Sequence, residues 1–151
     1  MARKKSSFMK RHGLSIVTGA ILGLWLILYA VSDEHKHWGA FFGNAIADWS
    51  GVVVMVLATK HLYERGSSES KQPKPGAAWH SHLLEFIREH SLTIFLLATG
   101  ALWVWLFARL NPDSKWGQVV GNVVSEWTQV LGLVLMTKKL VEVGSEESAK
   151  R

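Results

Sequence analysis

Four long apolar segments, separated by polar ones, dominate the pattern of residues along the chain. Segments 13–32 and 91–108 carry no formal charge. Segments 38–59 and 116–137 are equal in length, and the only charged residue in either is an acid near its middle. About 18 or more apolar residues can cross the roughly 30 Å hydrocarbon core of a bilayer as one α-helix. All four segments reach that length, so the pattern predicts an all-α integral membrane protein with four transmembrane helices.

The chain also repeats itself at a constant offset, which is the distance in sequence from Trp38 to Trp116. WGAFFGNAIADW, beginning at Trp38, aligns without a gap with WGQVVGNVVSEW, beginning at Trp116, and GSSES at Gly66 aligns with GSEES at Gly144. We interpret the chain as a tandem duplication of a helical hairpin, with both copies in one orientation and related by an axis along the membrane normal. The expected parts are a first hairpin repeat at 1–65 (helices about 12–32 and 38–62), a cytoplasmic linker at 66–78, a second hairpin repeat at 79–143 (helices about 91–109 and 116–140) and a cytoplasmic tail at 144–151.

The basic residues are distributed unevenly between the two sides of these helices. Of the 17 lysines and arginines, 14 lie before the first helix, between the second and third, or after the fourth. Only Lys36, Arg109 and Lys115 lie in the two short loops. This is the positive-inside pattern, and it predicts that both termini and the long connection are cytoplasmic. The net charge of +5 thus reflects topology, and nucleic acid is not an expected partner.

Two further segments flank the spanning helices. The first apolar run is longer than the roughly 7–15 residues of a signal peptide, so we expect it to be a retained helix. The segment AWHSHLLEFIREH, beginning at Ala78, has its apolar residues on one stripe and predicts a short helix at the membrane interface. The chain contains no cysteine, which excludes disulfides and thiolate metal ligands.

Two of the predicted spans each contain one acid far from both ends of the helix. Trp38 and Trp116 are expected to anchor their helices at the water–lipid boundary. Asp48 and Glu126 each follow ten residues later. At a rise of about 1.5 Å per residue, both acids lie roughly 15 Å deep, near the bilayer midplane. An ionised acid there costs at least about 2.5–3.5 kcal/mol, so these side chains must face the bundle interior, a partner subunit or water.

Amides accompany the two acids on the same helices. The candidate polar intramembrane site consists of Asp48, Glu126, Asn44, Asn122 and Gln129. One hypothesis is that these residues line a polar pathway or a proton or cation site, in which two nearby acids share a proton. The other is that they form hydrogen bonds between helices, each contributing about 0.6 kcal/mol, which fix the register of packing. Both hypotheses stay open, because duplication copies structural and functional residues alike.

A stripe of small residues runs beside the polar positions. It consists of Gly39, Gly43, Ala47 and Gly51 in the first repeat and of Gly117, Gly121 and Ser125 in the second. Such spacing lets helix backbones approach closely in a membrane. We therefore predict that the second and fourth spanning helices form the tight centre of the bundle, with the two acids flanking their contact.

His12 and His90 lie at equivalent cytoplasmic ends of the first and third spanning helices. Two such imidazoles could ligate a haem iron, but polar residues at a membrane boundary are the favoured interpretation. We expect no metal and no cofactor. The sequence contains no catalytic triad, P-loop, HExxH or glycine-rich nucleotide motif, so enzyme activity is not expected.

Three stretches, FIREHSLTIFLLATG, SEWTQVLGLVLMTKKLVEVGSEES and ADWSGVVVMVLATKHLYERGSSESK, resemble an uncharacterised bacterial membrane-protein family, catalogued as domain of unknown function 6766. Its members carry two hairpins, each ending in Gly-Ser-x-Glu-Ser. Asn122, Glu126, Trp127 and Gln129 match the family pattern, whereas Gly51 replaces the glutamine in the first repeat. The outer loops are shorter than those of the family. The resemblance implies this architecture and the bacterial inner membrane, and it implies no activity.

Two functions are consistent with these features. The first is a small channel or transporter whose central polar site contains Asp48 and Glu126. The alternative is a non-catalytic accessory or scaffold subunit of a membrane complex, in which the polar residues fix helix packing. The expected partners are the lipid bilayer and either further copies of the chain or a larger membrane complex.

Overall fold

The computed structural model describes residues 8–73 and 82–140. These residues form five α-helices: α1 (Phe8–Val31), α2 (His37–His61), α3 (His82–Glu89), α4 (Ser91–Arg109) and α5 (Lys115–Met136). In this part of the chain, all of them except α3 are long and apolar enough to cross a membrane. The predictions of an all-α fold and of four candidate spanning helices are confirmed.

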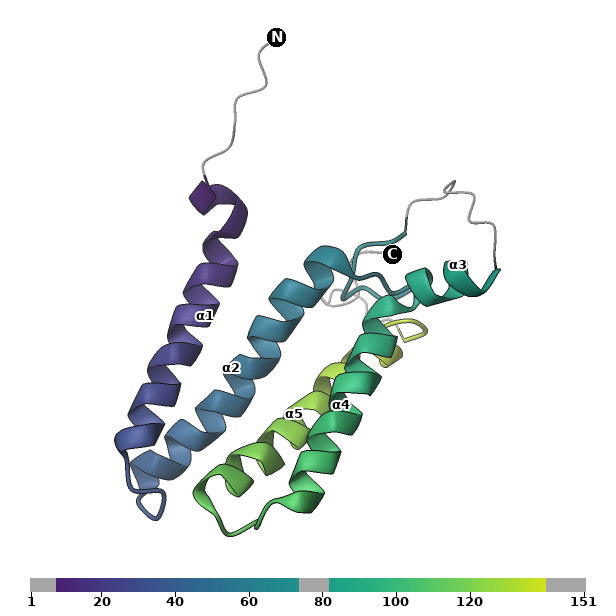
Figure 1. Ribbon diagram of the computed structural model, residues 1–151. Coiled ribbons are helices and arrows are strands. Elements are labelled where there is room, and N and C mark those ends of the chain that lie inside the picture. The colour runs from purple at the N-terminus through teal and green to yellow at the C-terminus, as the bar shows by residue number, and fades with distance from the viewer. Residues whose placement is uncertain (1–7, 74–81, 141–151) are drawn as a thin grey trace.

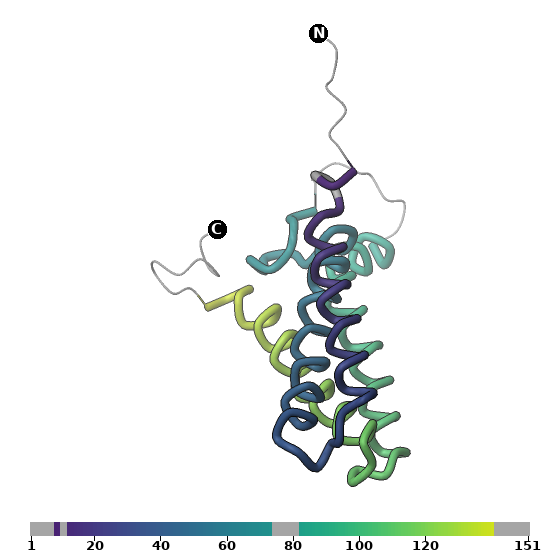
Figure 2. Tube along the Cα trace, turned by 90° about the vertical axis from the view of Figure 1, so that its left-hand side faces the viewer, coloured from purple at the N-terminus to yellow at the C-terminus, as the bar shows by residue number. Residues whose placement is uncertain are grey.

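The four long helices lie side by side (Figure 1). α1 packs against α2, α4 packs against α5, and α2 packs against α5. The short connections at 32–36 and 110–114 lie at one end of the molecule, while α3 and the loop at 62–73 lie at the other. The view turned by 90° shows the same separation of the two ends (Figure 2).

The core lies along the contact between α2 and α5. One buried cluster, nearer the short connections, consists of Tyr29, Ile46, Ala47, Val119, Val123 and Trp127. A second, nearer α3, consists of Ala58, Leu92, Leu96 and Val134. Many other large apolar side chains, such as Ile27 and Leu102, face outward. This distribution suits a protein whose solvent is lipid, because lipid tails are as apolar as the side chains themselves.

Asx turns shape both short connections. Asp33 accepts a hydrogen bond from the backbone N–H of His35 through its side chain, and Asn111 does the same for Asp113, both at 3.0 Å. Ser114 then caps α5 by accepting a hydrogen bond from the N–H of Gly117 at 3.1 Å. These contacts are the local turn chemistry that lets a few residues reverse the chain.

The structure assigns most of the glycine stripe to contacts within each hairpin. A Cβ on Gly39 would overlap the backbone of Asp33, and a Cβ on Gly117 would overlap the backbone of Asn111. These two glycines therefore make room for the preceding turn. They are not at the contact between α2 and α5 that their spacing had predicted, because spacing defines a helix face but not what packs on it.

The next glycines along the stripe contact an aromatic ring of the neighbouring helix. Gly43 lies under the ring of Tyr29 on α1, and Gly121 lies under the ring of Phe107 on α4. Both pairs occupy equivalent positions of the two repeats. At these positions the small residues bring together the two helices of each hairpin. Ala47 and Gly51, in contrast, lie at the predicted contact between α2 and α5.

The segment that follows α2 is a folded loop. The side chains of Ser67, Ser68 and Ser70 are only 1%, 4% and 8% exposed. Gly66 has a φ of 85°, in the left-handed region that favours glycine, and it allows the chain to turn back at this point. The sequence had predicted a linker from residue 66, because a composition rich in Gly and Ser is compatible with a linker as well as with a folded loop. The rest of that linker, at 74–78, lies outside the described residues.

The predicted short helix and the end of the last helix can also be compared with the structure. The short helix predicted before the third span is present as α3, and its apolar side chains, including Leu83 and Phe86, are exposed. Its place at the membrane interface stays a prediction. α5 ends at Met136, earlier than the expected residue 140, and Thr137 begins a turn. The expected tail at 144–151 also lies outside the described residues.

Candidate functional site

The predicted polar residues line a single groove at the contact between α2 and α5. This polar groove has a volume of about 120 Å³. It is lined by Asn44, Asp48, Asn122, Ser125, Glu126 and Gln129. All six lining side chains are polar, two are carboxylates and none is basic. The structure thus brings together all five members of the predicted site, with one serine from the small-residue stripe.

The two acids lie near the middle of their helices. Asp48 is eleven residues beyond the first residue of α2, His37, and Glu126 is eleven residues beyond the first residue of α5, Lys115. α2 has 25 residues and α5 has 22. Each asparagine precedes its acid by four residues and so projects from the same helix face. The periodicity of the helix places acid and amide in the groove together.

A hydrogen bond joins the two helices across the groove. The side-chain amide of Asn122 donates to the side-chain oxygen of Asn44 at 2.5 Å. The two residues are separated by 78 positions, which is the offset of the sequence repeat. Equivalent residues of the two repeats therefore meet each other at this point.

The acids are not equivalent in their surroundings. The carboxylate and Cγ of Glu126 lie directly over Gly51, where a Cβ would overlap them. Gln129 is the residue equivalent to Gly51 and shares the groove with Asp48. The longer acid thus lies over the glycine, and the shorter acid lies in the groove with the glutamine. A side chain at position 51 would therefore displace Glu126, which accounts for the glycine in the first repeat.

The groove opens onto the surface of the single chain. Asn44, Asp48 and Gln129 are all exposed. Three surroundings were expected for the acids: the bundle interior, a partner subunit or water. In the single chain Asp48 is exposed, whereas Glu126 is half-buried and lies over Gly51. An exposed carboxylate at membrane depth is costly unless protein or water covers it. If the groove lies in the membrane, Asp48 therefore needs water or a second protein beside it.

The predicted anchor residues Trp38 and Trp116 lie in the first turns of α2 and α5. Trp38 is 72% exposed and stacks with Phe42, with ring centroids 6.3 Å apart. Trp116 is 48% exposed and packs edge-on against Tyr29, at 5.4 Å. Both rings present part of their surface outward beside the short connections, which is compatible with the expected anchoring role.

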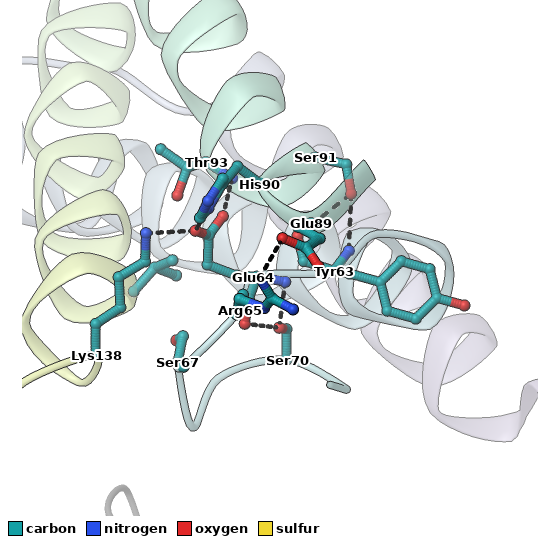
Figure 3. Close-up of polar contacts among 12 residues, drawn as sticks. Tyr63, Glu64, Arg65, Ser67, Ser70, Glu89, His90, Ser91, Thr93 and Lys138 are labelled. Carbon is teal, nitrogen blue, oxygen red and sulfur yellow. Dashed lines mark hydrogen bonds and ion pairs between the residues drawn. The ribbon is translucent and has the colours of Figure 1, made fainter. Parts of the chain in front are cut away.

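A second polar cluster, drawn in Figure 3, lies at the end of the molecule that contains α3 and the loop after α2 (Figure 1). We call Glu64 and the three residues that bind its carboxylate, His90, Thr93 and Lys138, the Glu64 cluster. Glu64 is 0% exposed. One carboxylate oxygen contacts Lys138 Nζ and lies 2.6 Å from His90 Nδ1, and the other accepts the backbone N–H of Thr93 at 3.0 Å. The cluster joins the end of α2 to α4 and to the end of α5.

The residues around Glu64 complete the N-terminus of α4. The first N–H groups of a helix lack partners within it. The carbonyl of Tyr63 accepts the N–H of Leu92 at 3.0 Å, and Ser91 Oγ accepts the N–H of Tyr63 at 2.9 Å. The residue that precedes α4, His90, supplies no side-chain cap. The loop after α2 therefore supplies the acceptors that this helix needs.

Serine hydroxyls hold the loop in this shape. Ser70 Oγ accepts the N–H of Glu64 at 2.7 Å and donates to the carbonyl of the same residue at 3.2 Å. Ser67 Oγ and Thr137 Oγ1 are 2.9 Å apart, which ties the loop to the end of α5. These two serines begin and end the SSES sequence that follows Gly66, so the repeated motif has a direct structural role.

The charge of Glu64 is compensated. Burial by itself raises the pKa of this carboxyl, but the hydrogen bonds from Lys138, Thr93 and His90 outweigh burial and bring the pKa below its usual range. Glu64 is therefore ionised at neutral pH. Beside the cluster, Arg65 and Glu89 form an ion pair at 2.8 Å that attaches the loop to α3. This arrangement is typical of a structural contact.

The two histidines considered as haem ligands each have a side-chain partner. His90 Nδ1 contacts Glu64, and His12 Nδ1 lies 3.0 Å from Lys60 Nζ. Within residues 8–73 and 82–140, no group of three or more His, Cys, Asp or Glu side chains is arranged to hold a metal ion.

The sequence analysis missed the roles of Glu64 and Lys138. Lys138 was counted only as one of the basic residues that determine topology. A usable signal was present, because the Lys and His at this end of the helices and the Glu before Gly-Ser all recur at the offset of the repeat. When a Glu, a His and a Lys recur together at helix ends, they are more readily explained by contact with one another than by a role in keeping the surface soluble.

The fold and the groove define a helical protein with four helices that are long and apolar enough to cross a membrane and with polar side chains near the middle of two of them. No protein-family model, no curated protein and no solved structure matches the chain. Membership of the family that the sequence resembles stays a prediction.

Proposed function

We propose that this chain is a multi-pass protein of the bacterial inner membrane that conducts or transports protons or small cations through the polar groove. The observation that carries this proposal is the composition of the groove. Two carboxylates and three amides from the middle of α2 and α5 line it, and none of its lining residues is basic. Polar residues at such a depth typically mark ion pathways or proton relays.

The chemistry of the groove favours cations over anions. Carboxylate and amide oxygens are ligands for hard cations. Asp48 and Glu126 lie in one groove, and carboxylates in membrane helices are typical binding groups for a proton or a cation. The pair can therefore exchange a proton or hold a cation without a basic residue to neutralise it.

The orientation of the chain follows from its charges. Both termini and the loop at 62–73 are placed in the cytoplasm by the positive-inside rule. The two hairpins are then parallel-related repeats with an axis along the membrane normal. The hydrogen bond between Asn44 and Asn122 supports this relation, because equivalent residues meet each other at a twofold axis.

A second candidate is an accessory or scaffold subunit of a membrane complex. Its support is the same hydrogen bond, since Asn44 and Asn122 fix the register of α2 against α5 directly. On this hypothesis a different membrane protein covers the open groove, and the acids remain protonated as hydrogen-bond donors. The polar residues would then be needed for assembly and not for flux.

Ion flux in proteoliposomes tests the proposal. Wild type should dissipate a proton or potassium gradient faster than empty liposomes. Asp48→Asn with Glu126→Gln should reduce that flux by about tenfold or more, because the charges that attract the cation are removed. Asp113→Asn with Glu85→Gln is the matched control, since it neutralises an exposed Asp and an exposed Glu outside the four long helices.

The two candidates give different outcomes. Flux that the control keeps and the groove variant loses supports a pathway. Wild-type liposomes that are as tight as empty ones to protons, sodium and potassium contradict the pathway and leave the scaffold. The groove variant should then fail to assemble or to co-purify with a partner.

A further inference from the structure

A histidine and a lysine meet at the cytoplasmic ends of the first two helices. His12 Nδ1 near the start of α1 lies 3.0 Å from Lys60 Nζ near the end of α2. At the offset of the sequence repeat, these positions correspond to His90 and Lys138. In the second hairpin, that equivalent pair binds the buried carboxylate of Glu64.

We propose that His12 and Lys60 form a second carboxylate-binding site and that its ligand is Glu142 of the same chain. Glu142 occupies the position equivalent to Glu64. Residues 141–151 lie outside the part of the chain that the structure describes, so only their sequence enters the argument. The segment after α5 would bind the first hairpin as the loop after α2 binds the second. This inference is independent of the proposed flux.

The segment after α5 keeps the residues that shape the loop around Glu64. In the first repeat, one glycine turns the chain and two serines hold it, as described above. The three residues Gly66, Ser67 and Ser70 correspond to Gly144, Ser145 and Ser148. The hydrogen-bond partner of Ser67 is kept as well: Ser67 bonds to Thr137, and the residue equivalent to Thr137 in the first repeat is Thr59. Both sides of the contact are therefore encoded twice.

Two leucines pack into one apolar cluster beside the Glu64 cluster, whereas the two leucines at the equivalent positions of the repeat are exposed. Leu92 is 0% exposed, and Leu62 packs against the buried cluster that contains it. The corresponding residues, Leu14 and Leu140, are 66% and 63% exposed. Binding of Glu142 at His12 and Lys60 would bring Leu140 toward Leu14. The charge pair and the apolar pair thus point to the same occupant.

The second site differs from the first in its backbone. α1 is continuous from Phe8 to Val31, whereas the helix breaks between α3 and α4 at His90. The first turn of α4 donates an N–H to Glu64, and a continuous α1 uses the equivalent group within the helix. Glu142 would therefore rely on Lys60 and His12, and we expect its contact to be the weaker of the two.

Disulfide trapping tests this proposal, because the chain has no cysteine of its own. Ser67→Cys with Thr137→Cys is the reference pair, since the two replaced oxygens are 2.9 Å apart. Thr59→Cys with Ser145→Cys is the equivalent pair at the proposed site. Oxidation in native membranes should link each pair within one chain, and mass spectrometry of the linked peptides would identify the bond.

Charge variants show whether the carboxylate directs the contact. Adding Glu142→Gln to the Thr59→Cys and Ser145→Cys pair should lower the yield of the link by about fivefold. Glu147→Gln is the matched control, because it removes the same charge from the same segment, and it should leave the yield unchanged. Three results overturn the proposal: no link while the reference pair forms, links only between two chains, or a yield that Glu142→Gln does not change.

A second measurement needs no cysteine. The melting temperature in detergent is compared for wild type, Glu142→Gln, Lys60→Gln and the double variant. If Glu142 binds Lys60, each single change should lower the melting temperature, and the double variant should lose little more than either one. Additive effects would overturn the proposal, since residues that do not touch act independently.

Discussion

A single buried charge, that of Glu64, holds three helices together at one end of the molecule. Replacing it by Gln keeps its shape but leaves Lys138 facing an uncharged group. Removing one partner of a buried ion pair costs roughly 3–5 kcal/mol. Because the side chain of Lys138 is 23% exposed, we expect the lower end of this range. Glu64→Gln should lower the melting temperature in detergent by several degrees, and Glu69→Gln in the same loop should have little effect.

The pH dependence of this difference identifies its cause. The pKa of Glu64 in the folded protein lies below the value of 4.5 that applies to the unfolded chain. The stabilisation that the charge of Glu64 contributes is therefore fully present above the unfolded-state pKa and is lost as the pH falls through the folded-state pKa. The difference in melting temperature between wild type and Glu64→Gln should shrink progressively below about pH 4.5. A difference that is equal at pH 7 and pH 3 would show that packing and not charge accounts for it.

At the scale of the elements, one glycine in each hairpin makes room for the turn that precedes it. Gly39→Ala and Gly117→Ala each place a Cβ against a backbone carbonyl of the preceding turn. Such overpacking costs roughly 1–3 kcal/mol, because backbone cannot move aside as a flexible side chain can. Gly19→Ala is the matched control, since its Cβ would meet nothing within 4 Å. Thermal melts should show a loss for the first two variants and none for the third, and equal effects at all three would contradict this assignment.

The helices themselves were predictable, because length and hydropathy determine them locally. The partners of a helix face were not. The stripe from Gly39 to Gly51 has one spacing, yet its members contact a turn, an aromatic ring and Glu126 in succession. The loop beginning at Gly66 was misread for a related reason. Gly and Ser are compatible with a linker and with a tight loop, and only the position of Glu64 against another hairpin distinguishes the two.

The candidate site was predicted in its residues but not in its surroundings. Counting residues from Trp38 and Trp116 was enough to place the acids at one depth, since the rise of a helix is constant. Whether the acids are enclosed depends on which helices pack beside α2 and α5. That arrangement involves contacts between residues far apart in sequence, and periodicity contains no information about them.

For the whole molecule, the groove between α2 and α5 is open to the surface, and a second copy of the chain would cover it with a groove of the same length and polarity. In a symmetric dimer the two grooves would face each other across a twofold axis, so equivalent residues near the axis would lie close together. Ser125 lines the groove and is exposed. Ser125→Cys should therefore form a disulfide-linked dimer on oxidation in membranes.

The outward-facing Leu102 on α4 provides the control. It is 53% exposed and lies on α4, which contributes no residue to the lining of the groove, so Leu102→Cys should remain monomeric on the same non-reducing gel. Equal cross-linking of both variants would indicate random collision. A monomeric Ser125→Cys, together with a monomer mass in detergent for wild type, would rule out the symmetric dimer. The groove would then be covered by water or by a different protein, and the second arrangement is the one that the scaffold hypothesis requires.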